Sequence, residues 1–162
     1  MGKIINLFKG EKQMISISDV AKTFLTFESM SPKKLQKLCY YAQAWYLALN
    51  NEPLVDSVFE AWIHGPVSPE LYHSYKVYGY NKIPKSKDIP SSIKDDSYIL
   101  SFIKHIYDIY GGFSGNTLEN LTHNELPWLN ARGNLETWQS SNRIISNEDM
   151  QCYYYTKYCS ED

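Results

Sequence analysis

The chain has 162 residues, of which 43% are hydrophobic and 15% aromatic, and its formal net charge is −2. This composition is typical of one globular domain with a substantial core and argues against a disordered chain. The slightly acidic balance argues against a general nucleic-acid binder, and no apolar run reaches the roughly 18 residues of a membrane-spanning helix.

The cysteines and the first residues indicate a cytoplasmic location. The three cysteines, Cys39, Cys152 and Cys159, are an odd number without a Cys-x-x-Cys pair, as expected of reduced thiols. Residues 1–13 have neither a long apolar core nor a small-residue cleavage site, so they make a poor signal peptide. We expect an N-terminal extension over residues 1–13 and a single domain over residues 14–162.

Two helices are predicted at the start of this domain. The first begins behind Ser18 as N-cap and ends near residues 27–29. The second begins at Ser31-Pro32 and ends at Asn50-Asn51, because asparagine tolerates the left-handed backbone that closes a helix. Its apolar residues recur with the helical period: Leu35, Leu38, Cys39, Ala42, Trp45, Tyr46 and Leu49.

A small β element is expected next. Residues 53–55 and 58–62 are short apolar runs that we predict to pair as antiparallel strands at the edge of the helical body. Gly65-Pro66 stops the second run, and Ser68 is a suitable N-cap for a helix that begins at Pro69. That helix ends at Gly79.

The remaining chain reads as helices joined by polar loops. Residues 81–94 are predicted to be a loop, and a helix capped by Asp95-Asp96 ends at Gly111-Gly112. Further helices are expected behind Ser114 or Asn116, over residues 126–132 and behind Ser146, with a short strand at 144–145. The predicted fold class is mostly α, a compact helical domain with a small antiparallel β element near residues 53–62.

The pattern of potentially reactive residues favours no catalytic or metal site. Ser68 lies near His64, but no Gly-x-Ser-x-Gly elbow surrounds it, and it serves better as an N-cap. Cys39 lies on the apolar stripe, where a thiol is inert. We therefore predict no catalytic residue, no metal and no cofactor. The histidines lack the spacing of metal ligands: His64, His73, His105 and His123.

Lysines and tyrosines are the residues that point toward protein recognition. Lys33 and Lys37 are one helical turn apart and share a face, which is either simply solvated or docks onto an acidic partner. The 14 tyrosines either fill half-buried positions or form a binding surface. Both features suit binding to a protein better than chemistry.

Three segments together carry a resemblance to a known family. Residues 35–49, LQKLCYYAQAWYLAL, and residues 60–72, EAWIHGPVSPELY, resemble in that order the Panacea domain of the SocA-like, phage-associated antitoxins. Residues 121–128, LTHNELPW, resemble the His-x-x-x-Pro-Trp segment of that family. The resemblance covers roughly residues 14–132.

This resemblance implies an antitoxin without enzymatic activity. It would neutralise a cognate toxin, encoded next to it, by direct protein–protein binding. Two alternatives stay open: a proteolytic adaptor that delivers the toxin to a protease, and a transcriptional regulator of its own operon. A homodimer is a further possible assembly, whereas the resemblance and the charge give no reason to expect a membrane or nucleic acid as the main partner.

The resemblance also sorts the motif residues by expected role. We expect the candidate toxin contacts to be exposed: Lys34, Lys37, Tyr41 and His64. We expect the other motif residues to be mainly structural: Leu35, Leu38, Ala42, Trp62, Gly65, Pro66, Val67, Tyr72, His123 and Trp128.

Overall fold

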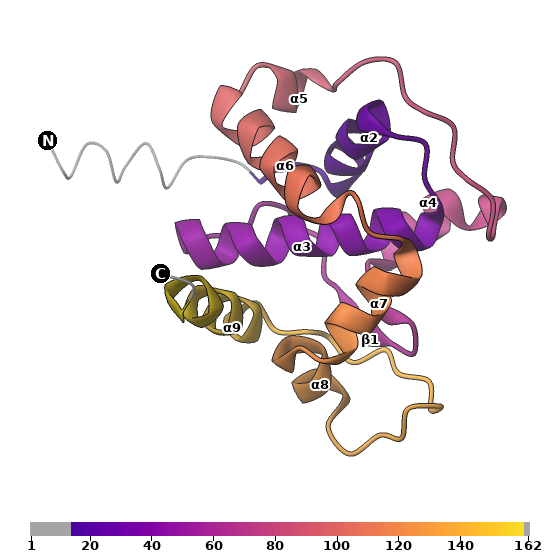
Figure 1. The fold of residues 1–162 in the computed structure, drawn as a ribbon, viewed down its shortest axis with the longest axis vertical. Helices are drawn as coiled ribbons and strands as arrows, with labels where there is room; N and C mark the ends of the chain where they lie inside the picture. The colour runs from indigo at the N-terminus through magenta and orange to yellow at the C-terminus, as the bar shows by residue number, and fades with distance from the viewer. Residues whose placement is uncertain (1–13, 161–162) are drawn as a thin grey trace, which may run out of the picture.

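A 19-residue helix, α3 (Pro32–Asn50), runs through the middle of the fold (Figure 1). The computed structural model describes residues 14–160, so the expected extension over residues 1–13 lies outside the described part. The helices α2 (Ile17–Phe27) and α6 (Ser97–Tyr110) pack on one side of α3. The helices α7 (Gly115–His123) and α9 (Asn147–Ser160) pack on the other side.

The central position of α3 explains its burial. Ser31 Oγ accepts a hydrogen bond from the Lys34 amide at 3.2 Å, and Asn51 ends the helix with a left-handed φ of 57°, so both predicted boundaries are confirmed. Every residue from Lys34 to Ala44 is buried, polar ones included. The apolar stripe in the sequence describes only one face, whereas neighbouring elements cover the helix on all sides.

Serine and aspartate side chains cap most of the helices, largely as predicted. Asp96, Ser114 and Ser146 each accept a backbone N–H three residues further on. The predicted cap of α2 is wrong by two residues: Ser16, not Ser18, accepts a hydrogen bond from the Asp19 amide at 3.3 Å. The helix can begin earlier because Ile17, its first residue, is buried in the core.

The small antiparallel sheet is confirmed, but residues 58–62 pair with the segment that follows them and not with residues 53–55. Strand β1 (Glu60–Trp62) pairs with β2 (Gly65–Val67) through the turn that contains His64. Residues 53–55 do not pair with β1. Instead, the Gln43 side chain of α3 binds the backbone amides of Leu54 and Val55 at 2.9 and 3.0 Å.

The hairpin leads into a helical segment at the rim of the fold. Helix α4 (Pro69–Tyr75) begins behind Ser68 and continues as the 3₁₀ turn η1 (Lys76–Tyr78), which ends at Gly79 with φ of 55°. Residues 81–94, predicted to be a loop, end in the short helix α5 (Ser91–Lys94) because Ile93 reaches the core. Helix α8 (Leu126–Arg132) connects α7 to the long loop before α9.

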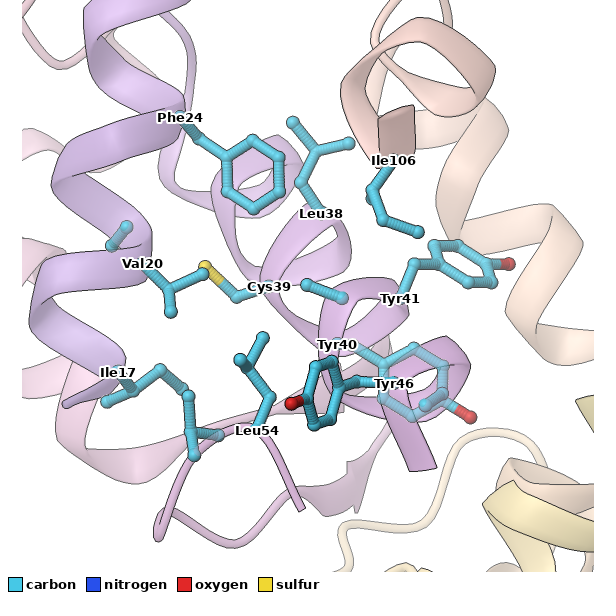
Figure 2. Packing of buried hydrophobic residues seen from close by; sticks show 14 of the residues in the cluster. Ile17, Val20, Phe24, Leu38, Cys39, Tyr40, Tyr41, Tyr46, Leu54 and Ile106 are labelled. Carbon is cyan, nitrogen blue, oxygen red and sulfur yellow. The ribbon is translucent and has the colours of Figure 1, made fainter. Parts of the chain in front are cut away.

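The core lies between α2, α3 and α6. Figure 2 shows Val20 and Phe24 of α2 pointing toward α3, with Ile106 of α6 close to Tyr41. The predicted fold class, mostly helical with a small antiparallel element, is confirmed. Within residues 14–160, no helix combines the length and the apolar character needed to cross a membrane.

Candidate functional site

Three of the four candidate contact residues are not exposed. The exposed fractions of Lys34, Lys37 and Tyr41 are 9%, 1% and 0%, and only His64 lies at the surface. The expectation of exposure is therefore wrong for the three residues of α3, because that helix is covered on all sides. Whether any of the four contacts a toxin stays a prediction.

Lys34 of α3 binds the C-terminal ends of α2 and α6. Its Nζ lies 2.8 Å from Glu28 Oε2 and donates to the Gly111 carbonyl at 2.6 Å. Tyr107 donates to the other oxygen of Glu28 at 2.5 Å. Partial burial alone would raise the pKa of Glu28, but the bonds from Lys34 and Tyr107 outweigh it and hold that pKa below its usual value. Lys34 thus has an evident structural role.

Tyr41 belongs to a buried hydrogen-bond network centred on Glu125, called the Glu125 network below. Tyr41 and Tyr154 both donate to Glu125 Oε1, at 2.7 and 2.8 Å. The hydroxyls of Tyr40 and Tyr154 are 3.1 Å apart, and Lys157 Nζ lies 3.7 Å from Glu125 Oε2. Burial raises the pKa of Glu125, while these donors favour the carboxylate. The network attaches α9 to α3.

A cleft of about 480 Å³ opens between the first turns of α3, the β hairpin and the α4–η1 segment. We call it the Lys37 cleft. Tyr72 and Tyr80 stand at its rim with exposed fractions of 43% and 100%. Trp62 contributes to a wall, where its ring meets that of Tyr72 with centroids 5.0 Å apart. The cleft therefore combines aromatic side chains from the hairpin and from α4.

Lys37 lies beneath this cleft, against the hairpin. Its Nζ donates to the Pro66 carbonyl at 3.2 Å. Gly65 has φ of 102°, and a Cβ there would lie 2.6 Å from Lys37 Cε and 2.9 Å from Thr122 Oγ1. The two main motif segments thus meet, since only glycine lets the hairpin approach the lysine. Burial lowers the pKa of Lys37 to about 7, although Glu119 opposes the shift.

His64 and Lys33 share one carboxylate at the edge of the cleft. Lys33 Nζ lies 2.7 Å from Glu119 Oε1, and His64 Nδ1 lies 3.3 Å from Glu119 Oε2. Burial would raise the pKa of Glu119, but the hydrogen bonds from Lys33 and His64 hold it below its usual value. Each oxygen of this carboxylate therefore contacts one of these two side chains.

Most motif residues pack inside the fold. His123 stacks on Trp128 with centroids 4.2 Å apart, and Trp128 Nε1 donates to the Trp62 carbonyl at 2.9 Å. Burial lowers the pKa of His123. Tyr72 differs from the others because it stands at the cleft rim. The remaining motif residues are buried: Leu35, Leu38, Ala42, Gly65, Pro66 and Val67.

Sequence reasoning missed two glutamines and an arginine that position the site. Gln36 accepts from the Ser68 amide at 2.9 Å and donates to the Ser68 carbonyl at 3.0 Å, which fixes the corner before α4. Gln43 does the same for residues 54 and 55. Arg132 donates to the Ala61 carbonyl at 3.1 Å. Their sequence signal is slight: Gln36 and Gln43 are two amides seven residues apart on one face of the predicted helix.

The two nucleophile candidates have structural surroundings. Cys39 is 1% exposed, and burial raises the pKa of its thiol. Ser68 Oγ accepts from the Leu71 amide at 3.4 Å, as a cap does, and lies 2.8 Å from Ser57 Oγ. Over residues 14–160, no three His, Cys, Asp or Glu side chains gather in a way that could hold a metal ion.

Comparison with known proteins supports the resemblance carried by these motifs. The profile of the family described as "Antitoxin SocA-like, Panacea domain" matches residues 35–129. Antitoxin SocA of Caulobacter vibrioides is 44% identical over 45 residues, which cover 28% of this chain and 24% of that protein. No solved structure matches the chain. Since the family profile spans more than half of the sequence, the chain belongs to the SocA-like antitoxin family defined by the Panacea domain.

Proposed function

We propose that this protein is an antitoxin that neutralises a cognate toxin by binding it directly. The observation that carries the proposal is the family match over residues 35–129, which contains most of α3, the hairpin and α4. The named relative, an antitoxin, points the same way. The three free cysteines suit the cytoplasm, where we place the encounter.

The surface of the matched region supports recognition of a protein. Tyr72 and Tyr80, which line the Lys37 cleft, expose 43% and 100% of their surfaces, and Val77, between them in the sequence, exposes 84%. Large exposed aromatic side chains beside a concavity are typical of interface anchors, because they bury much area at little loss of side-chain entropy. The proposal therefore places toxin contacts on the α4–η1 side of the molecule.

A non-enzymatic role agrees with the surroundings of the candidate nucleophiles. A thiol must ionise to attack, and burial opposes ionisation of Cys39. Ser68 Oγ is fully buried and engaged as a helix cap. His64 is held by Glu119 and lies at the edge of the cleft, so the Ser68–His64 hypothesis gains no support from these contacts.

Co-expression with the protein encoded by the adjacent gene tests this function. We expect that protein to stop growth alone, and we expect growth to return when the present chain is co-expressed and the two proteins co-purify. A harmless neighbour, or growth that does not return, would contradict the proposal.

The same experiment separates the two alternatives. Restored growth without a complex, together with a shortened half-life of the neighbour, would indicate a protease adaptor. A salt-dependent shift of promoter DNA by this chain alone would indicate an operon regulator, because phosphate contacts weaken steeply with salt. Light scattering of the free chain would establish whether it forms a homodimer.

A further inference from the structure

The charge of the Lys37 cleft is opposite to that of the protein. Lys33, Lys37, His64 and Lys76 line it, and no aspartate or glutamate is among the described residues that do. The whole chain has 18 acidic and 16 basic residues, so a cleft lined only by basic charge does not follow from composition. Such a site favours an anionic occupant through charge complementarity.

The buried amine of Lys37 is poorly partnered. Within the described residues, its Nζ has one hydrogen-bond acceptor, the Pro66 carbonyl at 3.2 Å. Lys34, three residues earlier, has a carboxylate at 2.8 Å and a carbonyl at 2.6 Å. A buried ammonium without a close counter-ion is unfavourable, so an anion placed in the cleft would stabilise it.

Glu119, the acid that acts on Lys37 electrostatically, is not a close counter-ion for its ammonium. Glu119 attracts Lys37, but its two carboxylate oxygens already contact Lys33 and His64. The positive charge of Lys33 lowers the pKa of Lys37 further, and the charge of Lys37 in turn helps to lower the pKa of His123. At the rim, Lys76 is exposed and its ammonium forms no ion pair with the part of the chain that the structure describes.

The rest of the cleft is apolar. Val67, Leu71 and Tyr75 line it together with Trp62, and the rings of Tyr72 and Tyr80 extend it toward solvent. Its volume of about 480 Å³ lies within the range of sites that hold a few side chains of a ligand. An occupant that matches both the basic and the apolar residues of the cleft therefore carries a negative group next to a large apolar one.

We propose that the Lys37 cleft receives an acidic segment of the toxin, in which an aspartate or glutamate side chain is adjacent to a large apolar side chain. This refinement rests on the proposed function. The carboxylate sits in the positive field of Lys37 and contacts Lys76, while the apolar side chain packs against Trp62 and Tyr72. Lys37 acts from beneath the cleft, where the low dielectric strengthens its attraction for the carboxylate.

A peptide titration tests the chemistry of the cleft without the toxin. Acetyl-Phe-Glu-Leu-amide is titrated into the ¹⁵N-labelled full chain, with the Gln and Lys versions of the peptide and inorganic phosphate as matched probes. We expect the Glu peptide to shift the amides of Tyr72, Lys76 and Tyr80 and to bind roughly tenfold more tightly than the Gln peptide. Equal binding of both peptides, or equal shifts with phosphate, would overturn the proposal.

Variants connect the cleft to the toxin. Lys76→Glu and Tyr80→Ala change exposed rim residues. Lys104→Glu makes the same charge reversal, and Trp138→Ala a comparable truncation of an aromatic side chain, at exposed positions outside the cleft. We expect affinity for the adjacent-gene protein to fall roughly tenfold or more for the rim variants and to stay unchanged for the controls. Lys37→Met should also lose affinity.

The two proposals fail in distinguishable ways. If the wild-type chain binds and neutralises the adjacent-gene protein while the rim variants and Lys37→Met bind it equally well, the cleft proposal is wrong and the antitoxin function stands. If the wild-type chain neither binds nor neutralises that protein, the function is wrong, and the cleft proposal that rests on it falls as well. In both cases the peptide titration reports independently on whether the cleft selects a carboxylate.

Discussion

Lys37 and Tyr41 lie one helical turn apart on α3; the first is itself a buried charged group, and the second binds one, Glu125 at the start of α8. The two groups differ in how they are partnered. Glu125, reached through Tyr41, accepts two tyrosine hydroxyls and faces Lys157. Lys37 donates to a single carbonyl. A fully satisfied polar network stabilises and specifies a fold, whereas a poorly satisfied charge costs stability and calls for another reason to be present. Glu125 is therefore best explained as a structural group, whereas Lys37 is a candidate for function.

Removal of Glu125 is expected to have the largest effect. Glu125→Ala leaves the hydroxyls of Tyr41 and Tyr154 without their acceptor, and each unsatisfied buried group costs roughly 1–3 kcal/mol. We expect the free energy of unfolding in urea to fall by about 2–5 kcal/mol. Glu136→Ala, at an exposed loop position, is the control. Similar stability of both variants would show that the network is not structural.

Removal of the Lys37 charge is expected to have the opposite sign. Lys37→Met keeps the apolar stem and deletes the buried ammonium, so we expect a gain of about 1–4 kcal/mol in unfolding free energy at pH 6 to 7. The same variant should bind the toxin with lower affinity. A loss of stability would instead mean that the bond to Pro66 makes Lys37 a structural residue.

The pH dependence sharpens this test. The pKa of Lys37 is about 7 in the folded chain and 10.5 ordinarily, so between these values the unfolded state binds more protons. The unfolding free energy of the wild type should therefore rise with pH relative to Lys37→Met. The advantage of the variant should be complete below about pH 7 and vanish near pH 10.5. A constant difference would contradict the shifted pKa.

Gly65 tests how closely the hairpin approaches Lys37. Both Gly65 and Gly79 have positive φ, but a Cβ at Gly79 meets nothing within 4 Å, whereas at Gly65 it would lie 2.6 Å from Lys37 Cε. We expect Gly65→Ala to cost about 1–3 kcal/mol more than Gly79→Ala. Equal losses would mean that backbone strain alone, and not the lysine, explains the glycine.

The smallest expected effect concerns the attachment of α9. Tyr154→Phe removes a hydroxyl that donates to Glu125 and contacts Tyr40, while the ring keeps its packing. We expect a loss of about 1–2 kcal/mol, measured by urea unfolding. Tyr155→Phe, on the exposed side of α9, is the matched control. An unchanged Tyr154→Phe would leave Tyr41 as the main donor to Glu125.

Local signals predicted the elements well, because caps and breakers act over a few residues. Ser31, Asn51 and Ser114 fix their boundaries through bonds to nearby backbone. Local signals could not show that the predicted strand over residues 53–55 stays unpaired with β1, since Gln43 holds residues 54 and 55 through a contact between separate elements. The strand that does pair, Gly65–Val67, looked like a corner because its first two residues are usual strand breakers.

The site was harder to predict for a related reason. A helical period shows which face is apolar, but not whether the polar faces are covered as well. Lys34, Lys37 and Tyr41 lie off the apolar stripe and yet are buried by α6, the hairpin and α8. The exposed rim residues Lys76 and Tyr80 carry no distinctive motif, so only the arrangement of α4 against α3 brings them to Lys37.

The distance along the chain between Tyr40 and Tyr154 has a consequence for how the protein forms. Their hydroxyls meet across 114 positions, so the contact can form only after nearly the whole chain has been synthesised. Closing such a long loop costs entropy and slows folding, whereas α3, the hairpin and α4 are joined by short connections. The residues that line the Lys37 cleft, by contrast, all lie between positions 32 and 80, so this part of the chain is synthesised well before α9.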